Sequence, residues 1–171
     1  MESLALLLAA TLNAGTVLAI AGLGLLLNER AGIVNLGAEG MMLVAAIAGY
    51  ATAVHTGSDA LAFAAGMAAG AALAAVFGAM VIWLNTNQYA SGLALSLFGA
   101  GFSAFIGIAY TQQKLGDRTA WAWPGVADIP FVGPALFRHH PMVYGAVLLA
   151  AALAWFLYRS RAGLVLRAVG E

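Results

Sequence analysis

The chain has 171 residues, of which 63% are hydrophobic and 8% are charged, and its mean hydropathy is +0.93. Soluble domains are about 45–50% apolar and about 25% charged, so this composition predicts an all-α polytopic membrane protein. Seven basic and seven acidic side chains leave no net charge, which removes the electrostatic case for nucleic acid as a partner. The lack of cysteine excludes disulfides, thiolate metal sites and a cysteine nucleophile.

Five stretches approach the roughly 20 apolar residues that an α-helix needs to cross a bilayer. They cover residues 3–27, 41–54, 60–84, 89–110 and 142–158. The first has no basic segment before it and is longer than the core of a signal peptide. We therefore expect it to be a retained membrane span.

The second stretch, residues 41–54, is too short to span by itself and follows the polar sequence "NERAGIVNLGAEGMM", residues 28–42. Gly32, Gly37 and Gly40 allow breaks in a helix and close approaches of backbone. Inside a membrane, irregular backbone is tolerated only where it is buried in protein or lines a cavity. We therefore predict a helix that is discontinuous around residues 31–54 and whose broken part enters from the cytoplasmic side.

Polar side chains near this break are candidates for a translocation pathway. Asn35 and Glu39 lie four residues apart, which places them on one face of a helix. Broken helices and ionisable residues at membrane depth are typical of such pathways, so we assign Asn35, Gly37 and Glu39 to it. The alternative is a plain cytoplasmic loop followed by a short, tilted helix.

The third and fourth stretches carry small residues at intervals of four. In the third stretch these residues are Gly66, Gly70, Ala74 and Gly78. In the fourth they are Gly92, Ser96, Ala100 and Ala104. Small residues on one face let helices approach closely, which is a main source of helix association in lipid. We interpret both faces as packing surfaces without a chemical role.

A second polar insertion, "NTNQYASGLALS", opens the fourth stretch. Asn85, Asn87 and Gln88 can cap that helix or bond to neighbouring helices, each such bond being worth about 1 kcal/mol or less. Asn87 and Gln88 are also candidates for substrate contact in the pathway. Both roles stay open at this stage.

The arginines give the expected orientation. Arg159, Arg161 and Arg167 follow the fifth stretch, and positive charge near span ends favours the cytoplasmic side. With five crossings, the N-terminus is expected outside and residues 111–141 form an extracytoplasmic loop. The C-terminal end of the chain is then cytoplasmic.

The outer loop contains tryptophans and an apolar segment, "IPFVGPALF", residues 129–137. Tryptophan favours the bilayer interface, so we expect this segment to lie along the membrane as a short helix or to receive a partner outside. His139 and His140 are adjacent, so on a helix they point about 100° apart, and no third ligand is evident. We expect no metal site.

Four segments, in this order and at these intervals, carry a resemblance to a known family. They are "NERAGIVNLGAEGMM", "NQYASGLALSLFGAGFSAFIG", "IPFVGPALF" and "RAGLVLRAVGE". The chain resembles the permease subunits of bacterial ABC importers for simple sugars and nucleosides, above all the shorter of the two permeases. The wider superfamily includes ribose-type and branched-chain amino acid permeases.

The resemblance implies a single transmembrane permease domain over residues 1–171, equivalent to the N-terminal half of the family members. Residues 159–171 resemble the start of the cytoplasmic segment that docks on the ATPase. The residues that the resemblance assigns to this coupling surface are Arg161, Gly163, Arg167, Gly170 and Glu171. The implied location is the bacterial plasma membrane.

The resemblance also implies the partners: a second, homologous permease, two ATPase subunits and an extracytoplasmic substrate-binding protein that delivers a small molecule. The chain has no GxxxxGK[ST] phosphate loop, so we expect no cofactor and no catalysis in this chain. ATP and magnesium would belong to the ATPase. The alternatives are a branched-chain amino acid permease of the same superfamily, half of a secondary transporter and a helical scaffold. An intramembrane enzyme is disfavoured because the predicted spans hold no pairing of a nucleophile with a base, such as serine with histidine.

Overall fold

The computed structural model describes residues 2–115, 121–122 and 138–170. Within them, five helices are long and apolar enough to cross a membrane, which confirms the predicted all-α polytopic fold. They are α1 (Glu2–Arg30), α2 (Ala38–Thr56), α3 (Asp59–Gly78), α4 (Gln88–Gly107) and α6 (Pro141–Arg159). The segment at residues 129–137, for which an interfacial helix was predicted, lies outside the described residues, as does Glu171.

Shorter elements complete the described chain. A π-helical turn, η1 (Ala79–Trp83), continues α3, and a 3-10 turn, η2 (Ile108–Tyr110), continues α4. The helix α7 (Arg161–Gly170) follows α6 after one residue. Two strands of two residues each, β1 (Trp121–Ala122) and β2 (Arg138–His139), pair in antiparallel register.

Polar residues set where several of these helices begin. The Ser58 hydroxyl accepts the Leu61 N–H at 3.4 Å and caps α3. The His140 ring accepts the Met142 N–H at 3.4 Å and caps α6, in which Pro141 occupies the first helical position. These caps satisfy N–H groups that have no partner inside the helix.

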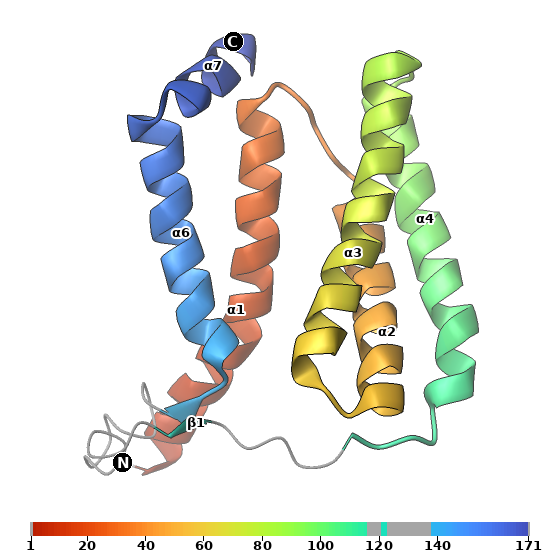
Figure 1. Ribbon diagram of the computed structural model, residues 1–171, viewed down its shortest axis with the longest axis vertical. Coiled ribbons are helices and arrows are strands. Elements are labelled where there is room, and N and C mark those ends of the chain that lie inside the picture. Colours follow the sequence, from red (N-terminus) through yellow and green to blue (C-terminus); the bar gives the residue numbers. More distant parts are fainter. Residues whose placement is uncertain (1, 116–120, 123–137, 171) are drawn as a thin grey trace. The chain divides into compact units, whose positions relative to one another are not determined.

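The chain divides into two compact units, Met1–Gly32 with Asp117–Glu171 and Ile33–Gly116. In the first unit, α1 packs beside α6, and α7 turns back across the ends of both (Figure 1). The His139 ring is 1% exposed and its Nδ1 lies 3.2 Å from Asn13 Oδ1 in α1. This polar pair joins the start of α6 to α1.

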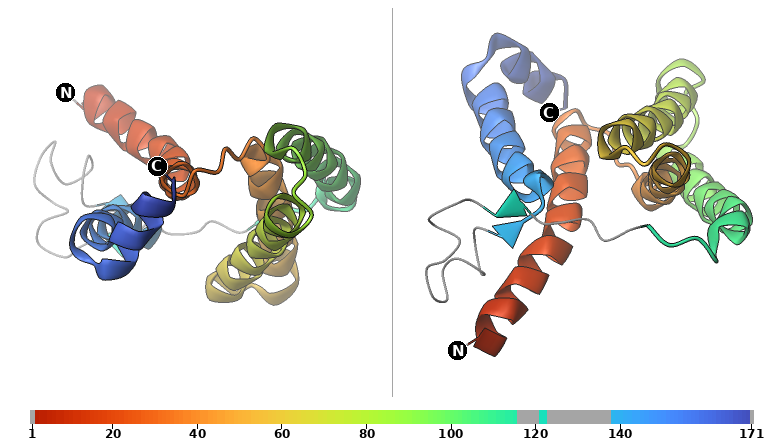
Figure 2. Two further views of the ribbon diagram at one scale, coloured as in Figure 1. Left: turned by 90° about the horizontal axis from the view of Figure 1, so that it is seen from above. Right: turned by 60° about the horizontal axis from the view of Figure 1, so that its bottom comes forward.

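In the second unit, α2 packs against both α3 and α4, and the three helices form one bundle (Figure 2). Its core is formed by Met41, Phe77 and Leu95. Partly buried apolar side chains surround this cluster, namely Ile33, Leu73 and Val81. The core therefore lies where the first turn of α2 meets α4 and the end of α3.

Residues 31–37, within the predicted discontinuous helix, are not helical and connect α1 to an unbroken α2. This arrangement is compatible both with the discontinuous helix and with the alternative of a loop followed by a helix. The helix α2 begins at Ala38, three residues earlier than the apolar stretch suggested, and its 19 residues qualify it as a span. The polar residues before Met41 therefore belong in part to the helix itself. The π-helical turn η1 was not predicted, since its sequence "AMVIW" holds no glycine or proline to indicate it.

Candidate functional site

Asn35 lies inside the break and uses its side chain on the neighbouring backbone. It is 9% exposed, and its Oδ1 accepts the Gly37 N–H at 2.9 Å. Its Nδ2 lies 3.7 Å from the sulfur of Met41. An asparagine that bonds the backbone two residues on stabilises a turn, so Asn35 shapes the entry into α2.

Gln88, in the first turn of α4, holds the other side of the break. Its Oε1 accepts the Val34 N–H at 3.0 Å, across 54 residues of sequence. The preceding residue, Asn87, caps α4 by accepting the N–H groups of Tyr89 at 2.9 Å and Ala90 at 3.2 Å. The two polar insertions therefore meet, and their side-chain oxygens satisfy backbone N–H groups that would otherwise lack a partner.

Glycines bring the backbones of α2 and α4 into contact just after the break. A Cβ built on Gly40 would lie 2.6 Å from Ser96 Cα, and one built on Gly99 would lie 2.5 Å from Gly40 Cα. A Cβ on Gly92 would meet the Leu36 nitrogen at 2.9 Å. No side chain other than hydrogen fits at these positions without a shift of backbone. The break is therefore fixed to α4 by sterics as well as by hydrogen bonds.

Glu39 differs from Asn35, although the two were assigned to one face. It is exposed and lies in the first turn of α2, where the helix dipole favours a carboxylate. Gly37, the residue before α2, is buried, and a Cβ there would lie 3.1 Å from the Gly92 carbonyl oxygen. Of the residues predicted for the pathway around the break, only Glu39 has an accessible functional group.

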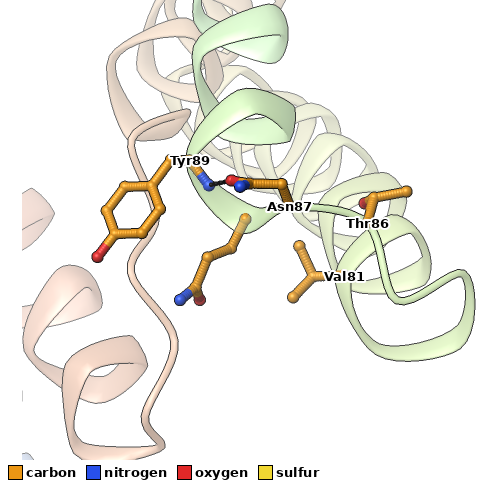
Figure 3. Close-up of a pocket in the computed structure, with 5 residues that line it drawn as sticks. Val81, Thr86, Asn87 and Tyr89 are labelled. Atoms are coloured by element: carbon orange, nitrogen blue, oxygen red, sulfur yellow. Dashed lines mark hydrogen bonds between the residues drawn. The ribbon is translucent and has the colours of Figure 1, made fainter.

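A shallow hollow lies beside the second polar insertion (Figure 3). It holds about 290 Å³ and is lined by Val81, Thr86, Asn87, Gln88 and Tyr89. No lining side chain is charged. Amide and hydroxyl groups beside one aromatic ring suit a neutral ligand that carries hydroxyl or carbonyl groups.

At the other candidate site, α7 is seated on the ends of two spans by glycines. A Cβ on Gly163 would lie 2.8 Å from Leu157 Cα in α6, and one on Gly170 would lie 2.8 Å from the Gly32 nitrogen after α1. Ser160 caps α7, since its hydroxyl accepts the Gly163 N–H at 2.9 Å. The sharp turn between α6 and α7 thus depends on one serine and one glycine.

The two arginines of α7 have different surroundings. Arg161 is exposed, whereas Arg167 is partly buried and its guanidinium lies 5.2 Å from the centre of the Tyr158 ring, in cation–π contact. The opposite side of α7 is apolar and exposed: Leu164 is 55%, Val165 63% and Val169 75% exposed. Sequence reasoning named the arginines and glycines of α7 and missed this apolar stripe, which recurs at helical spacing.

The small-residue face of α3 contacts α2 over part of its length. A Cβ on Gly66 would lie 3.1 Å from the Ala45 carbonyl oxygen, and one on Gly70 would lie 3.5 Å from Ala45 Cβ. Ala74 is exposed, and a Cβ on Gly78 would meet no atom within 4 Å. The face therefore packs at its first two positions and is open at the last two.

A polar and aromatic cluster that was not predicted joins the far ends of α2 and α4. The ring of Tyr110 makes edge contacts with Tyr50, at 6.2 Å between centres, and with His55, at 5.8 Å. Its hydroxyl lies 3.0 Å from His55 Nε2, and the Tyr50 hydroxyl donates to the Gln113 carbonyl. Across the part of the chain that the structure describes, no three His, Cys, Asp or Glu side chains are grouped so as to hold a metal ion.

Five candidate spans, a polar break fixed to a neighbouring helix and a short helix seated on two span ends define a multi-pass helical membrane protein. The chain belongs to the family described as the permease component of the branched-chain amino acid transport system, whose model matches residues 7–171.

Two relatives show how the match is distributed. The chain is 44% identical over 169 residues to a protein of Haloferax volcanii provisionally named a glucose ABC transporter permease, covering 96% of this chain and 51% of the relative. It is 32% identical over 185 residues to the guanosine ABC transporter permease of Bacillus subtilis, covering 99% of this chain and 57% of the relative. The chain thus spans little more than half the length of these relatives. No solved structure gives a significant match.

Proposed function

We propose that this chain is a transmembrane permease component of an ABC importer that moves nucleosides or simple sugars into the cytoplasm. The observation that carries this proposal is that alignments with permeases named for glucose and guanosine cover 96–99% of the chain. The chain itself is not an enzyme. ATP and magnesium are bound by separate ATPase subunits, which supply the energy.

The charges of the second unit support an uncharged substrate. The helices α2, α3 and α4 carry acidic side chains at Glu39 and Asp59 and no lysine or arginine. A branched-chain amino acid, the alternative that the family description suggests, brings a carboxylate that favours a cationic partner. The lack of a lysine or arginine in α2, α3 and α4, together with the uncharged hollow at Thr86–Tyr89, favours a neutral sugar or nucleoside.

The proposed assembly pairs the chain with a second, homologous permease. A substrate-binding protein delivers the ligand outside, where the N-terminus lies, and the ATPases act at α7 on the cytoplasmic side of the plasma membrane. Transport then follows from rigid helical units that rock about a central site. In this arrangement Glu39 faces the pathway, while Asn35, Gly37 and Gln88 hold the backbone around it, and Asn87 lines the hollow.

The contact with the ATPase is the exposed apolar stripe of α7. Leu164, Val165 and Val169 are exposed on the side of α7 opposite Gly163 and Gly170, the glycines that contact α6 and the end of α1. An exposed apolar stripe of this kind marks a surface for a protein partner. Gly163 and Gly170 seat the helix, and Arg161 lies at its start, where it remains free to pair with an acidic group of the ATPase.

The experiment co-expresses the tagged chain with the ATPase and the second permease, then measures co-purification and ATP-dependent uptake in proteoliposomes. We expect the ATPase to co-purify and labelled guanosine or glucose, rather than leucine, to be taken up. Val165→Glu should abolish ATPase binding, whereas the conservative change Val165→Ile at the same position should retain most of it. Uptake without ATP, driven by an ion gradient, would instead support a secondary transporter.

Glu39→Gln tests the pathway assignment in the same vesicles. This variant keeps the size of the side chain and removes its charge, and no described hydrogen bond of Glu39 is lost. We expect uptake to fall several-fold while ATPase binding is unchanged. Unchanged uptake would remove Glu39 from the pathway.

A further inference from the structure

The end of α7 and the end of α1 meet at two glycines. Gly32 follows α1 with φ +76°, and a Cβ built on it would lie 3.2 Å from Gly170 Cα. In return, a Cβ on Gly170 would lie 2.8 Å from the Gly32 nitrogen and would overlap the Arg30 carbonyl oxygen. The two backbones touch directly, with no side chain between them.

This junction is closer than the end of a helix requires. Gly57, which ends α2, has nearly the same conformation, φ +67°, but a Cβ there would meet no atom within 4 Å. The left-handed conformation explains a glycine at both sites, because other residues rarely adopt it. Only at Gly32 does a neighbouring backbone add a second reason.

Gly32 lies within the non-helical residues 31–37, and it is the residue of the first unit that is bonded to Ile33, the first residue of the second unit. Two residues on, the Val34 N–H is bonded to Gln88 of α4 at 3.0 Å. Displacement of Gly170 toward Gly32 would push on Gly32 directly, since no flexible side chain lies between them to absorb it. The break, bound to α4, is the next part of the chain to receive that movement.

We propose that the Gly32–Gly170 contact is the point at which movement of α7 reaches the break that precedes α2. The inference rests on the proposed function, in which an ATPase moves α7. Gly32 and Gly170 are positioning residues: they transmit displacement and contact neither substrate nor nucleotide. The contact lies within the first unit, and Gly32 is bonded to Ile33, so the peptide chain itself carries a displacement into the break. Packed backbone atoms shift together rather than deform.

The first test compares Gly32→Ala with Gly57→Ala in the co-expressed complex. Both variants place alanine at a positive φ, so both carry similar strain, but only the first also disturbs the contact. We expect Gly32→Ala to lower uptake per ATP hydrolysed about tenfold, a usual size for coupling between sites, with ATPase binding retained. Gly57→Ala should keep the ratio of uptake to hydrolysis near that of the unmodified chain. Equal ratios in the two variants would overturn the inference.

A second test does not depend on how well alanine fits. The chain has no cysteine, so Gly32→Cys and Gly57→Cys each introduce one thiol that a membrane-impermeant maleimide can label in open membranes. We expect ATP turnover to change the labelling rate at position 32 several-fold and to leave position 57 unchanged. A rate at position 32 that ignores ATP contradicts the inference.

The proposed function and the transmission of movement through Gly32 and Gly170 are overturned by different results. An unmodified chain that binds no ATPase removes the proposed function, and the transmission path with it. An unmodified chain that transports, alongside a Gly32→Ala variant that behaves like Gly57→Ala, removes the transmission path alone.

Discussion

The two sides of α2 are built differently. Toward α4, glycines on both helices bring backbone onto backbone, and a Cβ on Gly99 would lie 2.5 Å from Gly40 Cα. Toward α3, the equivalent approach is looser, since Cβ atoms on Gly49 and Gly66 would each lie 3.1 Å from a carbonyl oxygen of the other helix. Two side chains, Asn35 and Gln88, add hydrogen bonds near the α4 side only.

The two sides of α2 therefore have different roles: one mainly attracts the neighbouring helix, and the other fixes the position of α2 relative to its neighbour. The less tight contacts between α2 and α3 add dispersion energy in many small increments and allow the helices to shift by a few tenths of an ångström. Backbone overlap relieved only by glycine allows a single relative position of two helices. The α4 side of α2 therefore sets the geometry of the break, and the α3 side mainly adds stability.

The largest effect is expected at the centre of the α2–α4 crossing. Gly99→Ala places a methyl group against the Gly40 backbone and should lower the free energy of unfolding by about 3 kcal/mol, the upper end for an overpacked site. Gly101→Ala, on the same helix with nothing within 4 Å, should raise it by up to about 1 kcal/mol through helix propensity. Unfolding in mixed micelles measures both, and similar stabilities would mean that the crossing is not fixed by glycine.

A smaller loss is expected at Asn35. Asn35→Ala leaves the buried Gly37 N–H without its acceptor, which should cost about 2 kcal/mol. Asn87→Ala is the matched change at an exposed cap and should cost about 1 kcal/mol. The same unfolding assay separates them; a larger loss at Asn87 would show that burial of the break adds nothing.

Gln88→Ala should lower stability by about 1 kcal/mol, because it removes the single side-chain acceptor of the Val34 N–H. Hydrogen exchange at the Val34 amide is the sharper measurement, and we expect faster exchange there with the core of α4 unchanged. Gln112→Ala, at an exposed position after η2, is the control and should change neither. Slow exchange at Val34 in Gln88→Ala would mean that the break is held by the glycine contacts alone.

The sequence predicts the helices well and their contacts poorly, for a physical reason. Apolar length and polar interruptions are local properties, so the spans and the break near Gly37 were visible in one sequence. The pairing of Gly40 with Gly99, or of Val34 with Gln88, depends on which helices become neighbours. Spacing did indicate the face of α4 that contains Gly92, but not that Gly99, seven residues on, makes the tightest approach.

The surroundings of the polar residues predicted for the pathway also depend on where the helix begins. Sequence placed Asn35 and Glu39 on one helical face, which requires both to be helical. Asn35 precedes the helix, so its amide turns to the local backbone while Glu39 stays exposed. At α7, arginines stood out against an apolar sequence, whereas the stripe at Leu164 and Val165 became visible only once Gly163 fixed which face points inward.

The smallest predicted effect lies on the α3 side of α2 and completes the comparison. Gly66→Ala puts a methyl group 3.1 Å from the Ala45 carbonyl oxygen, which costs less than about 1 kcal/mol if α3 slides by a few tenths of an ångström. The gain in helix propensity, also up to about 1 kcal/mol, nearly offsets it, so we expect little net change in unfolding. Gly78→Ala, with open space around it, gives the propensity term by itself. A loss at Gly66 as large as that at Gly99 would show that α3 is held in register as firmly as α4, and the whole bundle, rather than the α2–α4 crossing, would then position the break.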